Sequence, residues 1–434
     1  AGTSNFRAGV NAGNSITSGG NYNTVVGDEA GTAITTGDSN VFVGYQSGDA
    51  TTISSSNIAI GESSLGTNIL SSKNVAVGSA ALFAHNLGSA GDGYNTAVGF
   101  YAGVAVTTGI SNTIMGGLAG DAITTGAKNT AVGASALGGN TTADNNTAFG
   151  FNTLNANTTG TSNVAIGAYA LDVNTTASNN TAVGYQSLSD NTTGVRNSAF
   201  GDNSLANNTT ANNNNAFGYL SLYTNTTGTQ NVAIGTEALT ANTTASNNTA
   251  VGYQAGLSNT TGTSNSAIGF QTLQANTSGS YNSASGSTAM YSNTTGANNT
   301  ALGFQSLNAN TTAADNTAIG SLCLDATTTG ANNTAVGRSA LTTNTTGYSN
   351  TSLGRQSMYW NTTGYNNTAV GMDASQSNTD GNSNVAVGHS SLFSNMGGDN
   401  NTAIGLQAGY SVSTGNNNVL IGFQNSSYGT ALTT

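Results

Sequence analysis

The sequence predicts an all-β fold, a parallel β-solenoid (β-roll) built from 17-residue coils. Three observations predict it: an Asn-x-x-x-Gly pentad that recurs every 17 residues, apolar residues at fixed positions of that unit, and charges confined to other positions. We number the 17 positions as columns, with the Asn of each pentad in column 1 and its Gly in column 5, as in Asn180 and Gly184.

The period extends over nearly the whole chain. The pentad recurs 24 times between Gly27 and Gly422, and one step is longer because of a short insertion at 83–93. Length alone suggests about three domains, but this self-similarity predicts a single domain over residues 1–434. With a degenerate first coil around Phe6 to Asn14 it would hold about 25 coils. Rungs about 4.8 Å apart would make a rod of roughly 120 Å.

The unit itself indicates strands rather than helices. Seventeen residues are too few for a helix pair, and the abundant Asn, Thr, Gly and Ser weaken a helical backbone. Column 4 is almost always apolar, column 2 is mostly Thr, Val or Ser, and column 9 is usually Leu. We expect a strand over columns 1 to 4, in which columns 2 and 4 point into the coil and column 3 points outward.

Charge and volume patterns support one packed interior. From Asp28 onward and outside the insertion, every Asp, Glu, Lys and Arg falls in columns 6, 7, 10, 11, 14, 16 or 17, which we expect to face solvent. Column 9 is Gly instead of Leu in six copies, and in four of them column 12 turns apolar, at Ile34, Val106, Ile123 and Val412. Columns 9 and 12 are therefore expected to share a core of fixed volume.

The invariant columns are expected to be structural. Stacked Asn side chains can form a hydrogen-bonded ladder along the coils, and Gly suits a corner that needs a positive φ or a close backbone approach. Column 12 predicts a second Asn ladder, unbroken from Asn140 to Asn310. The ladder residues of columns 1 and 5 include Asn163, Asn180, Asn197, Gly167, Gly184 and Gly201.

Composition excludes several classes of function. A net charge of -11 with only 5% charged residues argues against nucleic-acid binding, which needs a basic face. The chain has no run of 18 apolar residues, so we expect no membrane insertion. One Cys excludes a disulfide framework and leaves the redox compartment open. The chain starts at Ala1 without a leader, which fits a targeting segment that has been removed.

Residues for catalysis are sparse, and we expect no enzyme, no cofactor and no metal. His85 and His389 lie about 18 coils apart, too far to cooperate. Cys323 falls in column 8 among small residues and is expected in the core. Neither an Asp-rich calcium repeat nor a His/Cys metal spacing is present.

One region could bind a ligand. Arg338 and Arg355 occupy column 6 of successive coils, where two like charges favour an anion between them. Exposed aromatics nearby could stack on a sugar whose carboxylate pairs with Arg; the alternative is a solvated surface without a ligand. The candidate glycan-binding patch consists of Arg338, Arg355, Tyr348, Tyr359, Trp360 and Tyr365. Asn-Thr-Thr triplets such as Asn157–Thr159 match the N-glycosylation pattern, although a ladder position is the preferred interpretation.

Column 3 suggests more than one chain. It is Ala in 19 of the 24 copies and is never charged. A strand without charge on either face predicts burial on both sides. We expect column 3 to meet a neighbouring chain in a parallel homo-oligomer, most simply a trimer, with separate monomers as the alternative.

The pentads also carry a family resemblance. "NVAIG" from Asn163 and "NSAIG" from Asn265 resemble the head repeats of trimeric autotransporter adhesins of the YadA type. The longer unit "NTAVGYQSL…NTTG" is similar to repeats of phage and viral tail-fibre proteins and related bacterial surface proteins. The resemblance implies a parallel β-roll, a trimer, and attachment to a host or surface. The chain departs from it in its longer repeat and in showing no heptad stalk, membrane-anchor barrel or terminal chaperone.

The expected function is therefore a non-catalytic extracellular fibre or adhesin shaft at a cell or virion surface, with a cell-surface glycan or receptor as partner. The first alternative is a subunit of an end-to-end extracellular filament, because uncapped solenoid edges can pair. Ice binding is a further alternative. It ranks low because columns 13 and 14, the adjacent Thr columns, are expected to point to opposite faces. The receptor, the handedness of the coil and the oligomeric state stay open.

Overall fold

The computed structural model describes residues 2–423. The chain forms two compact units, Ala1–Asn214 and Asn215–Thr434. Each unit is a parallel β-solenoid of 17-residue coils, and together they hold about 24 turns, with no helix among the described residues. The predicted all-β parallel β-solenoid is confirmed, whereas the trimer and the single domain over residues 1–434 stay predictions.

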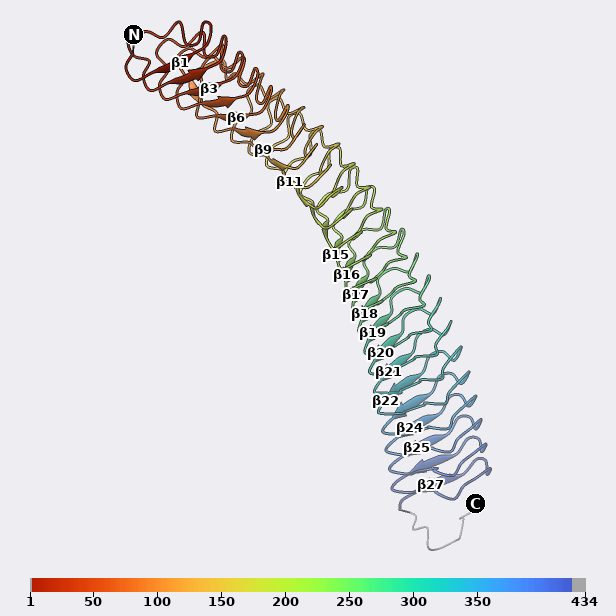
Figure 1. The fold of residues 1–434 in the computed structure, drawn as a ribbon. Coiled ribbons are helices and arrows are strands. Elements are labelled where there is room, and N and C mark those ends of the chain that lie inside the picture. Colours follow the sequence, from red (N-terminus) through yellow and green to blue (C-terminus); the bar gives the residue numbers. More distant parts are fainter. Residues whose placement is uncertain (1, 424–434) are drawn as a thin grey trace. The chain divides into compact units, whose positions relative to one another are not determined.

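Short strands mark one wall of each coil and follow one another along each unit (Figure 1). The first unit contains β1 Phe6–Ala8, β2 Thr24–Val26, β3 Val41–Val43, β4 Ile58–Ile60, β5 Ser71–Ser72, β6 Val75–Val77, β7 Gly91–Asp92, β8 Thr96–Val98, β9 Thr113–Met115, β10 Thr130–Val132, β11 Thr147–Phe149, β12 Val164–Ile166, β13 Thr181–Val183 and β14 Ser198–Phe200.

The second unit continues the same pattern. It contains β15 Asn215–Phe217, β16 Val232–Ile234, β17 Thr249–Val251, β18 Ser266–Ile268, β19 Ser283–Ser285, β20 Thr300–Leu302, β21 Thr317–Ile319, β22 Thr334–Val336, β23 Thr351–Leu353, β24 Thr368–Val370, β25 Val385–Val387, β26 Thr402–Ile404 and β27 Val419–Ile421.

The strands pair in register, column upon column. Between β10 and β11, for example, Ala131 lies beside Ala148 and Val132 beside Phe149. Every such pair is parallel, and its partners are 17 residues apart except between β1 and β2, where they are 18 apart, and across the insertion. Because each coil repeats the register of the one before, whatever a column places on the surface recurs along the unit.

The direction of the strand side chains differs from the prediction. In the three-residue strands between β2 and β26 the middle residue, column 3, is buried, while columns 2 and 4 are half-buried or exposed. Ala131 and Ala182 are fully buried, whereas Phe149 is 55% exposed. The prediction that columns 2 and 4 point inward was wrong. Alternation along a strand shows only that columns 2 and 4 share one face and column 3 the other. Which of the two faces is buried depends on the wall that the strand packs against, and not on which column is more apolar.

The opposite wall explains why column 3 is Ala. A Cβ placed on Gly256, in column 9, would lie 3.9 Å from the Cβ of Ala250, in column 3. The two walls are therefore close, and column 3 Ala meets column 9 Leu across the core. Where column 3 is large, column 9 is Gly: Cβ atoms on Gly48 and Gly103 would lie 2.7 Å from Phe42 and 2.8 Å from Ile114.

Burial of column 3 inside the coil removes the argument for a trimer that was based on it. The Ala stripe is covered by its own chain, so it needs no neighbour. An oligomer, if one forms, must use another surface.

Compensation between columns 9 and 12 is confirmed. Cβ atoms on Gly31 and Gly120 would lie 2.7 Å from the Cδ1 atoms of Ile34 and Ile123, and both isoleucines are fully buried. Val106 is fully buried as well, while Val412 is half-buried. Columns 3, 9 and 12 thus contribute to one core.

The corner at column 5 has the backbone expected of it. Gly167, Gly184 and Gly201 have φ values of 126°, 136° and 135°. A Cβ on Gly184 would collide with the carbonyl oxygen of Gly201 in the next coil. Both reasons for Gly, a positive φ and close backbone approach, therefore apply.

Other turns reach positive φ without glycine, which the sequence did not predict. Columns 7, 9 and 17 are left-handed in coil after coil, as at Gln186, Leu188 and Arg196, with φ values of 50°, 55° and 58°. A left-handed residue with a side chain costs roughly 1–2 kcal/mol. The glycines of column 9 therefore relieve backbone strain as well as giving up a side chain.

Two Asn ladders hold the coils together. In column 1 the backbone N–H of Asn197 donates to Oδ1 of Asn180 (2.9 Å), and Nδ2 of Asn180 donates to the carbonyl of Gly194 (2.9 Å). The backbone N–H of Asn180 in turn donates to Oδ1 of Asn163 (3.0 Å). The predicted ladder is confirmed, with the backbone N–H as its regular donor.

Column 12 forms the side-chain-to-side-chain ladder. Nδ2 of Asn174 donates to Oδ1 of Asn157 (2.9 Å) and to the carbonyl of Ala177 (3.1 Å). These Asn side chains are fully buried. The ladder therefore supplies the hydrogen bonds that their amide groups cannot make to solvent.

Candidate binding surfaces

The six residues of the predicted glycan patch lie on the second unit, in separate groups. Tyr348 and Tyr365 stack with ring centroids 4.9 Å apart and an interplanar angle of 2°. Tyr359 and Trp360 pack edge to face, 4.8 Å apart at 81°.

The two arginines stand apart from these rings. Arg338 and Arg355 are exposed in column 6, after β22 and β23. Within residues 2–423 no hydrogen bond, ion pair or ring contact joins either arginine to the four aromatic residues. The structure brings the aromatics together in two pairs, and the joint role of all six residues as a glycan site stays a prediction.

A further aromatic pair, outside the predicted patch, was missed by sequence reasoning. Phe393 and Tyr410 stack at 4.9 Å and 3°. Both occupy column 10, as Tyr359 does, so the column frame itself was the signal that could have found them. Column 10 follows column 9, whose side chains face the strand wall across the core, so these rings lie on the opposite side of the coil from the strands.

Polar side chains of column 10 usually have a structural partner. Nδ2 of Asn155 donates to the carbonyl of Ser135 (2.9 Å), a column 7 residue of the preceding coil, and Oγ1 of Thr342 donates likewise to the carbonyl of Leu322 (2.9 Å). Asp172 also lies in column 10, but its buried Oδ1 has no partner among the described residues. Burial raises the pKa of Asp172, and the nearby charge of Asp190 adds to the shift.

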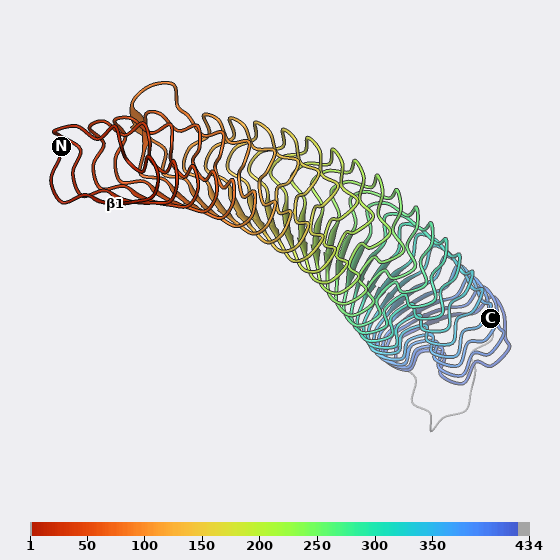
Figure 2. The same ribbon diagram turned by 45° about the horizontal axis from the view of Figure 1, so that its top comes forward.

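All described charged residues lie at the surface or are half-buried, which confirms the predicted sorting of charges. One ion pair is present in residues 2–423, between Lys73 and Asp92 (2.8 Å), where Nζ of Lys73 also lies 3.1 Å from the hydroxyl of Tyr94. Asp92 and Tyr94 flank the end of the insertion, whose loop stands out from the coils of the first unit (Figure 2).

An apolar stripe runs along the outer face of the strands in both units. Column 4 supplies branched or aromatic side chains, and aromatic residues of column 6 lie beside it. We call these residues the strand-face stripe. In the first unit its exposed members are Ile60, Met115, Phe149 and Ile166, with Tyr45, Phe100, Phe151 and Tyr185. In the second unit they are Phe217, Ile234, Ile268, Leu302, Ile319, Ile404 and Ile421, with Tyr219, Tyr253, Phe270, Phe304 and Phe423.

Neither Thr column points into the core: column 14 is exposed, and column 13 is half-buried in most coils. Thr158 and Thr159 are exposed, between buried Asn157 and buried Gly160. The expectation that columns 13 and 14 point to opposite faces was wrong, because they lie in a turn and not in a strand. Column 13 hydroxyls donate to the next coil, as Oγ1 of Thr158 does to the carbonyl of Thr175 (3.0 Å), whereas column 14 forms the outermost row. The Asn of each Asn-Thr-Thr triplet in this ladder is buried and hydrogen-bonded, so the folded coil hides it from a glycosylating enzyme.

One hydroxyl and one imidazole lie close enough to resemble a catalytic pair. Oγ of Ser71 is 2.9 Å from Nε2 of His85, which occupies column 12 at the insertion. Both residues are fully buried, and Nδ1 of His85 has no partner among the described residues. Burial lowers the pKa of His85 to about 4. A substrate would have no access to this pair without opening of the coil.

Cys323 lies in the core, as predicted. It is fully buried, and its Sγ lies 3.2 Å from the carbonyl oxygen of Ala335. Burial raises the pKa of the thiol to about 12, so it is protonated at neutral pH.

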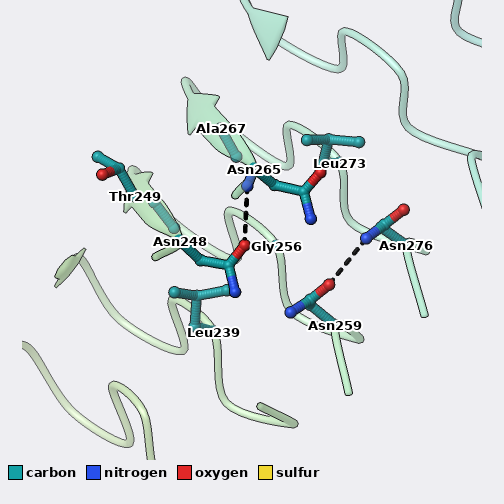
Figure 3. Close-up of a pocket in the computed structure, with 10 residues that line it drawn as sticks. Leu239, Asn248, Thr249, Gly256, Asn259, Asn265, Ala267, Leu273 and Asn276 are labelled. Carbon is teal, nitrogen blue, oxygen red and sulfur yellow. Dashed lines mark hydrogen bonds between the residues drawn. The ribbon is translucent and has the colours of Figure 1, made fainter. Parts of the chain in front are cut away.

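A small cavity marks the one column 9 glycine that no large neighbour compensates. Gly256 lies between Leu239 and Leu273, and column 12 of this coil is the polar Asn259. The cavity has a volume of about 10 Å³ and lies between the two Asn ladders (Figure 3). This is at the lower limit for one water molecule, so the cavity is a packing defect and not a ligand pocket.

Neither a metal-binding cluster nor a membrane-spanning helix is present among the described residues. No group of three or more His, Cys, Asp or Glu side chains in residues 2–423 could hold a metal ion. The same residues include no helix with the length and apolarity to cross a membrane.

No protein-family model and no curated protein matches the sequence. The resemblance to YadA-type head repeats and tail-fibre repeats therefore stays a prediction.

Proposed function

We propose that this chain is the shaft of an extracellular fibre or adhesin on a cell or virion surface, in which parallel copies pack side by side and hold an attachment surface away from its origin. The observation that carries the proposal is the strand-face stripe. It adds exposed apolar side chains along both units. Column 4 contains no charged residue in any repeat, and column 6 beside it has five charged residues in the 24 repeats.

Such a stripe favours a second copy of the chain as its partner. Soluble monomers rarely expose contiguous apolar patches larger than roughly a few hundred Å², and interface cores are depleted of charge. The stripe repeats at every rung, about every 4.8 Å. A parallel copy in the same register meets that spacing at each coil, and a trimer is the simplest closed arrangement that places three such faces around an axis.

The interior of the coils is consistent with the role of a stable spacer. Each coil adds the same ladder hydrogen bonds and the same core side chains, so the stability of a unit is the sum of many equal contributions. Function would then come from length and repetition, without a catalytic site. The extracellular location and the attachment role rest on the resemblance of the pentads.

The oligomer can be tested by sedimentation equilibrium of the purified chain. We expect a trimer, and we expect Phe149→Glu with Ile166→Glu, in adjacent coils of the stripe, to give monomers. The matched control is Thr159→Glu with Thr176→Glu, on the exposed Thr row, which should leave the mass unchanged. A monomeric wild-type chain would contradict the proposal. Long continuous fibres in electron micrographs would instead favour the end-to-end filament.

The outward Thr rows favour ice binding as a second candidate. Thr159, Thr176 and Thr193 stand in one exposed row in successive coils, which is a regular array of hydroxyl and methyl groups. Thermal hysteresis of the pure chain is the measurement: a gap between melting and freezing that is lost in Thr159→Lys with Thr176→Lys supports this candidate, and no gap removes it.

A further inference from the structure

Aromatic side chains gather on column 10 of the second unit, on the wall opposite the strands. Tyr359 in column 10 and its neighbour Trp360 in column 11 follow β23; Phe393 follows β25 two coils later, and Tyr410 follows β26 three coils later. Gln376 occupies column 10 in the coil between them. We call these five residues the column-10 strip.

Trp360 is the exposed ring of the strip, whereas Tyr359, Phe393 and Tyr410 are half-buried. Trp360 is 52% exposed, and its backbone N–H donates to the carbonyl of Gln376 (2.9 Å). An edge-to-face pair such as Tyr359 with Trp360 uses at most one face of one ring, so a broad aromatic face is left for a ligand. Phe393 and Tyr410, stacked at 4.9 Å, form the second platform.

The spacing suits an extended polymer. Tyr359 and Phe393 lie two rungs apart, about 9.6 Å along the unit, with a polar side chain at the rung between. A linear polysaccharide presents the apolar C–H face of one sugar ring after another and hydroxyl groups at their edges. Rings that stack on the two aromatic platforms would place a hydroxyl-bearing ring over Gln376.

Polar groups beside the strip accept hydrogen bonds rather than attract an anion. Nε2 of Gln376 donates to Oδ1 of Asp373 (3.2 Å), which leaves the amide oxygen and the second carboxylate oxygen for hydroxyl donors. No Lys or Arg follows Arg355 in the sequence, and the net charge is -11. An anionic polymer would therefore be repelled, and a neutral one is favoured.

We infer that the column-10 strip binds a neutral, extended polysaccharide whose sugar rings stack on Trp360 and on the Phe393–Tyr410 pair. The site keeps Tyr359 and Trp360 of the patch predicted from the sequence and has no need of its arginines. It lies on the wall opposite the strand-face stripe, so it does not depend on the proposed oligomer. Binding would give the shaft a ligand along its side.

The test uses the full chain and neutral polysaccharides as probes. Affinity electrophoresis in gels that contain soluble cellulose derivatives, xylan, mannan or glycol chitin should show retardation by at least one of them. Trp360→Ala should weaken that binding about tenfold or more, and Phe393→Ala with Tyr410→Ala should weaken it as well. Trp360→Phe, which keeps an aromatic face, should lose less than Trp360→Ala. Circular dichroism checks that each variant is folded.

Controls separate the strip from the other surfaces. Arg355→Ala and Tyr348→Ala alter the rest of the predicted patch and should leave the binding unchanged. Trp360 is the only tryptophan, so its fluorescence in the wild-type chain should shift on titration with an oligosaccharide of the retarding polymer.

Three outcomes overturn the inference: no neutral polysaccharide binds, binding survives the loss of Trp360 together with Phe393, or the chain binds only a polyanion such as alginate and loses it in Arg355→Ala. The oligomer measured by sedimentation is independent of all three.

Discussion

At the scale of single residues, the exceptions to the repeat carry the distinctive chemistry. His85 stands where most coils have a ladder Asn, and its buried ring leaves Nδ1 without a partner. Asp172 stands where other coils place an amide or hydroxyl that caps a carbonyl. Both residues interrupt a hydrogen-bonding pattern that their neighbours complete, and both should make stability depend on pH.

We expect His85 to destabilise the fold as the pH falls. Its pKa is about 4 in the folded chain against 6.5 as the ordinary value, because burial opposes the charged ring. The folded state therefore binds fewer protons than the unfolded state, so stability is complete above pH 6.5 and is lost as the pH falls towards 4. Between about pH 7.5 and about pH 5 the loss in unfolding free energy should be about 2 kcal/mol.

Urea denaturation of His85→Asn at both pH values checks this expectation. The new amide should bond in its coil as Asn68, the column 12 residue of the preceding coil, does when its Nδ2 donates to the carbonyl of Ser71 (2.8 Å). The variant should therefore lose the pH dependence of stability that comes from the imidazole. His389→Asn, in half-buried column 6, is the matched control and should behave as the wild type. If the unfolding free energy of His85→Asn fell between the two pH values by as much as that of the wild type, His85 would not be the source of the pH dependence.

Asp172→Asn should stabilise the chain at neutral pH. The raised pKa of Asp172 means that its contribution is favourable only below the ordinary value of 3.8 and is lost as the pH rises through the folded pKa. An amide removes that penalty and can donate to the carbonyl of Asn152, as Asn155 does to Ser135. The gain should be about 1 kcal/mol at pH 7 and should shrink below about pH 4.

Thermal unfolding at about pH 7 and about pH 3 measures this gain. Asp315→Asn, at an exposed column 17 position, serves as the control and should change stability little. A loss of stability in Asp172→Asn at pH 7 would show that the carboxylate has a partner that we have not identified.

At the scale of the coil, two walls face each other across a narrow core, and each wall sets the volume of the other. Ala in column 3 fits against Leu in column 9, while Phe42 and Ile114 fit against glycines. Column 3 volume and column 9 volume therefore vary in opposite directions along the sequence. Among the column 9 glycines Gly256 is the exception, since both its own and the following column 3 residue are Ala, and a cavity results.

Filling that cavity should stabilise the second unit. The backbone of Gly256 already has φ 62°, close to the 51° of Leu239 in the same column. In Gly256→Leu the new Cβ would lie 2.9 Å from Cδ2 of Leu239, the mobile end of a side chain that can shift. Burial of a Leu side chain contributes about 2 kcal/mol and the left-handed backbone costs about 1 kcal/mol. The expected net gain is about 1 kcal/mol.

Gly120→Leu in the first unit is the matched control. There the space is filled, because the new Cβ would lie 2.7 Å from Cδ1 of the fully buried Ile123. Overpacking should lower the free energy of unfolding by about 1–3 kcal/mol. Denaturant titration of both variants decides the matter, since equal effects would show that core volume does not govern column 9.

The repeat unit could be predicted from the sequence because it is periodic, but the phase of its strand could not be read from hydrophobicity. The exact 17-residue spacing fixed the coils, the ladders and the column 5 corner, and charge sorting identified the outer columns. Column 4 is more apolar than column 3, yet it lies outside. The inverse relation of Phe42 and Gly48 contained the correct answer, since only facing columns compensate in volume. The left-handed turns at column 7 left no such signal, because Gln, Ser and Asn all occupy them.

The candidate binding site was predictable only in part. Tyr359 and Trp360 stood out because Trp360 is unique, and their ring contact is present. The arginines were grouped with them by nearness in sequence, although a coil carries nearby residues to different walls. Phe393 and Tyr410 were overlooked for the same reason, since they are far from Tyr359 in the sequence but share its column in the repeat.

At the scale of the whole molecule, each solenoid unit is a stack in which a coil contacts the coils before and after it. The strand pairs and both ladders connect neighbouring coils only. Stability should therefore be a sum of coil terms and nearest-neighbour terms, as in other linear repeat proteins. A substitution that removes a hydrogen bond between coils should therefore destabilise the adjacent coil and not a coil several repeats away.

A double-mutant cycle on the column 1 ladder measures that range. Asn282 and Asn299 are in adjacent coils, and both the backbone N–H and Nδ2 of Asn299 donate to Oδ1 of Asn282 (3.0 and 3.2 Å). Asn384 is in the same unit, six coils from Asn282. Asn282→Ala and Asn299→Ala remove overlapping hydrogen bonds, so the loss in the double variant should fall short of the sum by at least about 0.5 kcal/mol. Asn282→Ala with Asn384→Ala shares no bond, and its losses should add within about 0.5 kcal/mol. Coupling of similar size in both pairs would contradict the nearest-neighbour description. In a nearest-neighbour stack the loss of one ladder hydrogen bond affects only the two coils that the bond joins. Coupling over six coils would instead mean that the whole unit responds as one block.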